Sequence, residues 1–327
     1  MTNKQKMLYL KEKISGSQAN IPVDKLLTVL VDSFSRRQIR KELDAGHITL
    51  NGRRVRRASQ TARAGDLLEL RCPDHRRSPE KRQLQPETLD PSHIIYQDDH
   101  TICLNKPPFL LSQASKNQNH PHVISVMQKL PGFQPQDLPE GLFLCHRLDK
   151  ETSGVLLLAS QPQQAEFLMN QFRERKTKKQ YLALCHGIPA DKEWKSTHFL
   201  SPIDKQTGNV RVVHSGGKKA VTSFRLLEAF PEHKLSLLSC SPDTGRGHQI
   251  RVQLEACGFS IVGDKRYGAR KALPPSVESL ISHHLLHARK LGFFPAAESP
   301  MLWVEAALPT SFQKVLDVLR TGKTHGK

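Results

Sequence analysis

Closely spaced cysteines are missing from this sequence, and so are the motifs that usually indicate a bound metal or cofactor. Its six cysteines lie far apart without a Cys-x-x-Cys pair, which argues against both a zinc site and a disulfide framework. Neither a phosphate-binding loop nor a dinucleotide-binding fingerprint is present. No motif of the sequence thus indicates a bound metal or cofactor.

Long hydrophobic runs are also absent. No run approaches the roughly 18 apolar residues that a membrane span requires. The N-terminus offers only the apolar stretch 7–10, which is shorter than the apolar region of a signal peptide. The sequence therefore predicts a cytoplasmic protein without a membrane partner.

Acidic residues are scarce relative to basic ones. Asp and Glu number 31 against 49 Lys and Arg, which gives a net charge of +18. Such an excess favours a polyanionic partner such as nucleic acid, although a generic basic soluble protein is the alternative. The length of 327 residues corresponds to two domains at about 150 residues each.

The segment 21–72 has the pattern of a small module of two helices and a sheet. Apolar residues recur at helical spacing over 23–31, and a second helix is expected over 35–46, with capping-box spacing at its start and glycine at its end. The pair Asn51-Gly52 predicts a tight hairpin turn. This segment resembles the S4 domain, a small RNA-binding module.

Cations are concentrated on the second helix and the hairpin of this module. Arginine binds phosphate oxygens through two parallel hydrogen bonds, so we expect both elements to contact RNA; a solvated charged surface is the alternative. The expected RNA-binding residues here are Arg36, Arg37, Arg40, Lys41, Arg53 and Arg54.

The remaining boundaries follow from composition. Residues 1–20 are polar and lysine-rich, which predicts a flexible leader, and residues 73–91 contain almost nothing apolar, which predicts a linker. A second domain is expected over 92–315, followed by a basic tail over 316–327.

A polar stretch between two apolar runs, 142–145 and 155–159, is the most informative part of the second domain. It reads as a turn between buried strands, and its sequence is His146-Arg147-Leu148-Asp149-Lys150-Glu151-Thr152-Ser153-Gly154. From spacing alone two interpretations stay open: a reactive site, or a turn that satisfies its own backbone while Arg147 pairs with Asp149 or Glu151.

This stretch resembles the active-site motif of the RluA-type pseudouridine synthases. Two later stretches are similar to further motifs of that family: Lys179-Gln180-Tyr181, and the run from Thr244 to Arg251. The stretch 105–108 resembles the family's first motif, although Phe109 stands where glycine is usual, and we assign it a structural role.

The resemblance implies an RNA pseudouridine synthase, an isomerase that works without cofactor or metal. Asp149 would be the nucleophile, and Tyr181 would stack on the target base. Arg251 would be the cation beside Asp149, with Arg246 as the alternative. A paired base has to leave its stack to be reached.

The residues before the nucleophile have an expected role in that extrusion. His146 and Arg147 would fill or line the space that the base vacates. The route stays open between direct attack by Asp149 and a glycal intermediate.

Substrate and class also leave alternatives. Large-subunit ribosomal RNA is the first expectation and transfer RNA the second, and the specific uridine is not indicated. The rival class is a non-catalytic RNA-binding ribosome-assembly factor on the same fold, for which retention of Asp149, Tyr181 and Arg251 together would be unexplained.

The expected fold class is α+β. A small S4-like module would be joined by a linker to a domain with a mixed, largely antiparallel sheet flanked by helices, and we expect a monomer with no obligate protein partner. His283, His284 and His287 lack ligand partners at metal spacing, so we expect them on the surface, facing RNA.

Overall fold

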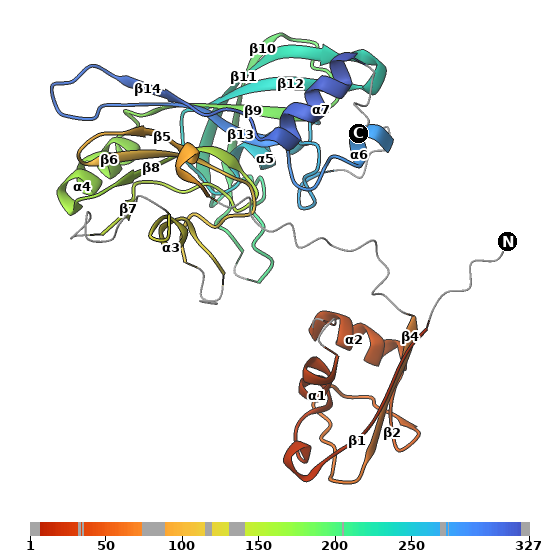
Figure 1. The fold of residues 1–327 in the computed structure, drawn as a ribbon. Coiled ribbons are helices and arrows are strands. Elements are labelled where there is room, and N and C mark those ends of the chain that lie inside the picture. Colours follow the sequence, from red (N-terminus) through yellow and green to blue (C-terminus); the bar gives the residue numbers. More distant parts are fainter. Residues whose placement is uncertain are drawn as a thin grey trace. The chain divides into compact units, whose positions relative to one another are not determined.

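The computed structural model shows two compact units, which divide between Gln83 and Leu84 (Figure 1). It describes residues 7–31, 34, 36–73, 89–114, 120–130, 141–204, 206–268, 273 and 275–321. The central part of the predicted linker, the extreme N-terminus and the last residues of the predicted tail lie outside these ranges, as does Ser35, the expected cap of the second helix.

The first unit is a four-stranded sheet packed against two helices. The strands are β1 (Met7–Lys13), β2 (Ile48–Leu50), β3 (Arg53–Arg54) and β4 (Leu67–Pro73), in the order β1-β4-β2-β3, and the helices are α1 (Val23–Leu30) and α2 (Arg36–Ala45). Asn51 and Gly52 have φ values of 51° and 75°, as the tight turn between β2 and β3 requires. The two predicted helices and the hairpin are confirmed.

The predicted flexible leader over residues 1–20 is wrong from residue 7 onward, where β1 begins. β1 pairs with β4 along its whole length, and Leu8 and Ile14 are buried in the core of this unit. Burial alternates along this segment: Leu8, Leu10 and Ile14 face the core, whereas Tyr9, Lys11 and Lys13 are exposed, as in a half-buried strand. The sequence conceals this alternation, because Met7 to Leu10 are all apolar or aromatic and Lys11 to Lys13 are all charged.

The second unit is built on a ten-stranded mixed sheet. Its main path runs β10-β11-β12-β9-β13-β8-β6-β5, with β14 paired to β13 and β7 to β8. Among the strand pairs of this sheet in the described residues, β13–β8 is parallel and the others are antiparallel. The strands are β5 (Ile94–Gln97), β6 (Thr101–Lys106), β7 (Phe143–Leu144), β8 (Ser153–Ala159), β9 (Lys178–His186), β10 (Glu193–Leu200), β11 (Lys218–Phe230), β12 (Leu235–Pro242), β13 (Leu286–Phe293) and β14 (Leu302–Glu305). The predicted mixed, largely antiparallel sheet is confirmed.

Helices cover both faces of this sheet (Figure 1). They are α3 (Val123–Met127), α4 (Pro162–Arg173), α5 (Gln249–Ala256), the short α6 (Pro275–Glu278) and α7 (Thr310–Thr321). α7 packs on Leu184 of β9, whereas α5 packs on the neighbouring Ala183 and Cys185. Because side chains alternate along a strand, α5 and α7 lie on opposite faces.

Two predicted boundaries of this unit need correction. Leu89 is buried in its core and Asp90 caps a short 3-10 helix, so the unit begins before residue 92. α7 extends to Thr321 and buries Leu316 and Leu319, so the predicted basic tail over 316–327 is helical through residue 321.

Candidate active site

Asp149 lies in the connection between β7 and β8, the buried strands that the apolar runs predicted. The backbone N–H of Thr152 donates to the Asp149 carbonyl over 3.1 Å, which closes the turn. The Asp149 side chain is 28% exposed and lines a cavity of about 820 Å³. It is therefore a carboxylate that a ligand can reach.

Arg251 of α5 is the cation beside this carboxylate. Its Nη1 donates to Asp149 Oδ2 over 2.8 Å, and its side chain is only 8% exposed. The alternative cation, Arg246, donates instead to the carbonyl of Lys219. Arg147 is exposed. The Asp149 carboxylate thus pairs with Arg251 of α5 and not with Arg147 of its own turn.

Asp264 holds Arg251 from the other side. Two hydrogen bonds of 2.7 and 3.0 Å join Arg251 Nε and Nη2 to Asp264, and the guanidinium lies 5.1 Å above the ring of Tyr267. Burial alone would raise the pKa of Asp264, but the hydrogen bonds and charge of Arg251 outweigh it and lower that pKa to about 2. Asp264 thus stays ionised and fixes the guanidinium.

The start of α5 is anchored by Gln249. Its Oε1 accepts hydrogen bonds from the Thr244 hydroxyl and the Arg246 backbone N–H, and its Nε2 donates to the carbonyl of Val221. His248, in the left-handed conformation with φ of 54°, precedes it. Gln249 therefore ties the loop before α5 to β11 and fixes the start of the helix that carries Arg251 two residues further on.

The residues on either side of Asp149 are also fixed. Ser112 exchanges two hydrogen bonds with the backbone of Leu148. Lys106, fully buried at the end of β6, donates through Nζ to the carbonyls of Pro107, Leu110 and Lys150. The structural role predicted for the stretch 105–108 agrees with these contacts.

The histidines expected on the surface are buried, and that expectation was wrong. Thr152 and His284 are joined by a 2.8 Å hydrogen bond, and Ser153 donates to His287 Nδ1 over 2.9 Å. His287 Nε2 donates to the carbonyl of Ala306. Burial lowers the pKa of His287 to about 4, so the ring is neutral near pH 7 and its Nδ1 accepts from Ser153. These histidines hold the end of the Asp149 turn.

His283 belongs to the same buried group. It packs edge-on against Phe109, with ring centroids 5.1 Å apart. Phe109, which stands where glycine was expected, adopts φ of 68°, a conformation that costs a side-chain-bearing residue free energy. The ring contact is the stabilising interaction that this residue gains.

Tyr181 and His146 form walls of the cavity. Tyr181 lies on β9, partly buried, and burial followed by the charge of Asp149 raises its pKa well above the ordinary value. His146 stacks on Phe172 at 4.6 Å and accepts the backbone N–H of Leu157. Burial lowers the pKa of His146 to about 3, so this ring is neutral.

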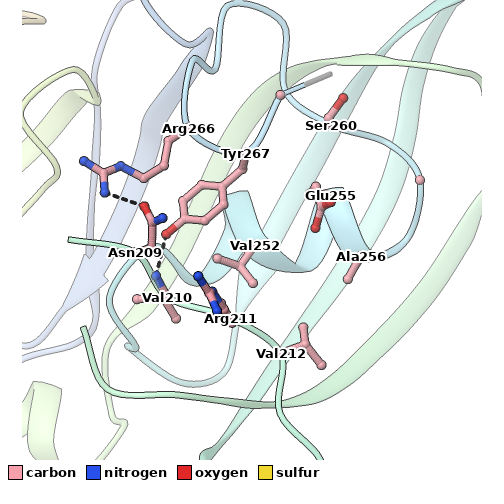
Figure 2. A pocket seen from close by; sticks show the side chains of 12 residues that line it. Asn209, Val210, Arg211, Val212, Val252, Glu255, Ala256, Ser260, Arg266 and Tyr267 are labelled. Atoms are coloured by element: carbon pink, nitrogen blue, oxygen red, sulfur yellow. Dashed lines mark hydrogen bonds between the residues drawn. The ribbon is translucent and has the colours of Figure 1, made fainter. Parts of the chain in front are cut away.

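A second cavity, of about 690 Å³, lies next to the Arg251–Tyr267 contact. Figure 2 shows Tyr267 on its wall with the hydroxyl directed at the backbone of Val210, and Arg266 directed at Asn209. The Tyr267 hydroxyl also bonds His248 Nδ1. These contacts hold the Tyr267 ring against the guanidinium of Arg251. We therefore assign this wall a structural role and no catalytic one.

In the first unit, the predicted RNA-binding cations are partly described. Arg40, Lys41 and Arg53 are exposed. Arg54 donates to the carbonyl of Asp44 near the end of α2, so part of its hydrogen-bonding capacity is used within the fold. Arg36 and Arg37 begin α2, and their side chains lie outside the described residues.

Comparison with known proteins places this site in a family. Residues 100–256 match the family model described as RNA pseudouridylate synthase, and residues 22–68 match that of the S4 domain. The chain is 26% identical to the solved structure titled Human RNA Pseudouridylate Synthase Domain Containing 4, with a TM-score of 0.55 over 70% of this chain and 93% of that one. The fold and site thus define an RNA pseudouridine synthase.

Two bacterial relatives cover almost the whole chain. An uncharacterized RNA pseudouridine synthase of Aquifex aeolicus (strain VF5) is 30% identical over 94% of this chain and 95% of its own length. Ribosomal large subunit pseudouridine synthase C of Vibrio vulnificus (strain CMCP6) is 32% identical over 90% and 93%. The chain belongs to the RNA pseudouridine synthase family, in the RluA-like group with an N-terminal S4 domain, and is an isomerase.

The helices of the described residues are all too short or too polar to cross a membrane.

Proposed function

We propose that Asp149 is the catalytic nucleophile of this pseudouridine synthase. The observation that supports it is the asymmetry of the carboxylate. Oδ2 accepts from the nearly buried Arg251, whereas the imidazole nitrogen Nε2 of His248 lies 3.9 Å from Oδ1, beyond hydrogen-bond distance. One oxygen is held by the protein and the other is available to a substrate.

The reaction breaks the bond between C1′ and N1 of uridine, rotates the uracil and joins C1′ to C5. The C5 proton is lost and N1 gains one, so the net change is an isomerisation without redox chemistry. An ionised carboxylate beside a fixed guanidinium suits direct attack by Asp149 and equally suits assistance of a glycal route.

Tyr181 serves as the aromatic surface for the uracil. Its raised pKa keeps the hydroxyl protonated at neutral pH, which favours stacking over proton removal as its role in the resting site. Arg147, exposed beside Asp149, occupies the position that the extruded base leaves, and His146 completes the wall behind it.

Large-subunit ribosomal RNA is the proposed substrate. The support is the name of the Vibrio vulnificus relative, a ribosomal large subunit pseudouridine synthase, together with the S4 module at the N-terminus. Transfer RNA is the alternative that the experiment separates.

The test is site-resolved pseudouridine mapping of total RNA from cells lacking the gene, complemented with wild type, Asp149→Asn or Asp191→Asn. Asp191 is an exposed aspartate before β10 and serves as the matched control. We expect one or a few ribosomal sites to disappear and to return with wild type and Asp191→Asn only. Restoration by Asp149→Asn would refute the nucleophile, and sites confined to transfer RNA would refute the substrate.

A further inference from the structure

The end of α4 carries an arginine in a backbone position that normally takes glycine. The N–H of Lys176 donates to the carbonyl of Gln171 and that of Arg175 to Phe172, the pair of bonds that ends many helices with a left-handed residue. Here that residue is Arg175, with φ of 60°. An arginine side chain thus occupies a position whose left-handed backbone conformation favours glycine.

The side chain of Arg175 lines the cavity that contains Asp149, and so does that of Arg173. Both are exposed. Among the residues that the structure describes, neither guanidinium has a hydrogen bond or an ion pair, whereas the adjacent Lys176 pairs with Glu174 at 2.7 Å. The dipole of α4 accounts for a cation in its last turn, but not for a left-handed arginine beyond it.

Other cations of the same wall are already engaged with the protein. Lys179 Nζ donates to the carbonyl of Thr244, and Arg246 to that of Lys219. Burial lowers the pKa of Lys179; the charge of Asp243 acts against this, and the charge of Arg175 lowers the pKa further. Lys179 and Arg175 therefore lie close enough to repel each other. Positive charge at this wall exceeds what the protein itself neutralises.

We infer that Arg173 and Arg175 form a phosphate-binding site of the cavity, which holds backbone phosphates of the RNA strand beside the extruded uridine. The inference rests on the proposed extrusion of the base. A strand with one nucleotide turned outward presents its flanking phosphates to the enzyme, and two guanidinium forks bind phosphodiester oxygens in pairs. Such contacts fix the register of the strand without reading its sequence.

The decisive variant is Arg175→Gly, because it should weaken RNA binding without lowering the melting temperature. Glycine relieves the left-handed backbone, so the melting temperature should stay equal or rise. Loss of the guanidinium should weaken binding to in vitro transcribed, unmodified large-subunit ribosomal RNA. Weakened binding with retained stability cannot be attributed to misfolding.

The salt dependence of RNA binding measures how many phosphate contacts each variant loses. We expect the slope of log Kd against log salt concentration to decrease by about 1 for Arg175→Gln and by about 2 for the double variant Arg173→Gln/Arg175→Gln. Arg225→Gln, on the exposed side of β11, is the control of equal charge change and should keep the wild-type slope. An unchanged slope in the double variant, or an equal decrease in the control, would overturn the inference.

Failure of the nucleophile proposal and failure of the phosphate-site inference give different results. Asp149→Asn with wild-type turnover refutes the catalytic proposal, whatever the salt slopes. Unchanged slopes in the arginine variants, together with an inactive Asp149→Asn, refute only the phosphate site.

Discussion

Ser112 and Leu148 are joined by two hydrogen bonds through a single hydroxyl group. Ser112 Oγ donates to the Leu148 carbonyl over 2.8 Å and accepts the Leu148 N–H over 3.1 Å. Both backbone groups of the residue before Asp149 are satisfied in this way. The position of the carboxylate therefore depends on a side chain remote in sequence.

Replacing Ser112 by alanine should destabilise the catalytic unit and slow turnover. Two buried backbone groups lose their partner, at a cost of about 1–3 kcal/mol. Urea unfolding and single-turnover rates measure the two effects. Ser223→Ala, on β11, serves as the control and should change stability by less than about 0.5 kcal/mol; equal effects of the two variants would contradict the positioning role of Ser112.

Gly154→Ala should prevent accumulation of folded protein. Gly154 has φ of +111°, and a Cβ there would lie 2.2 Å from the carbonyl oxygen of Ala288, because β8 and β13 pair at this point. Gly216 also has positive φ, at +71°, but open space around its Cβ position, so Gly216→Ala should cost only about 1 kcal/mol. Soluble yield and melting temperature compare the two variants, and similar behaviour would show that the close approach to Ala288 is unimportant.

Asp264→Asn should destabilise the enzyme more than Asp149→Asn does. Both residues contact Arg251, but Asp264 has a 1% exposed side chain against 28% for Asp149. Removal of one partner of a buried ion pair costs about 3–5 kcal/mol, and solvent weakens the pair that Arg251 makes with the partly exposed Asp149. Urea unfolding of the two single variants and the double variant measures the difference, and the reverse order would be inconsistent with Asp264 as the main anchor of Arg251.

Acid should destabilise the catalytic unit through its buried histidines. Burial lowers the pKa of His283 and His287 from 6.5 to about 4, so between these values the unfolded chain binds protons that the folded state does not. Stability is complete above pH 6.5 and is lost as the pH falls, by about 2 kcal/mol per histidine at pH 5.

Urea unfolding at pH 7.5 and pH 5 tests this sign. His287→Gln removes one titrating group and should lose about 2 kcal/mol less than wild type between these pH values. His214→Gln, at an exposed position, should keep the full wild-type loss. A wild type more stable at pH 5 would contradict the prediction.

Local patterns predicted most elements because the signals were short-range. The apolar runs around Asp149, the helical spacing over 23–31 and the Asn51-Gly52 turn each depend on neighbouring residues, and the structure confirms all three. The Arg251–Asp149 pair came from family resemblance rather than from spacing. Its catalytic meaning stays a prediction.

The errors concern features that only long-range packing decides. β1 is a strand because it pairs with β4. Residues 1–20 alone do not reveal that partner. The buried His284 and His287 depend on Thr152 and Ser153, far away in the chain. Asp264 was not among the predicted site residues, and only the fold brings it to Arg251.

The Asp149 turn is held at Leu148, Lys150, Thr152 and Ser153 by side chains from other parts of the second unit. A carboxylate held in this way is preorganised, and it reaches its working position before any ligand arrives. The conformational change that binding requires then has to occur in the nucleic acid. The pace of the enzyme on folded RNA should follow the opening of the target base pair, and an unpaired uridine in the same sequence should react faster.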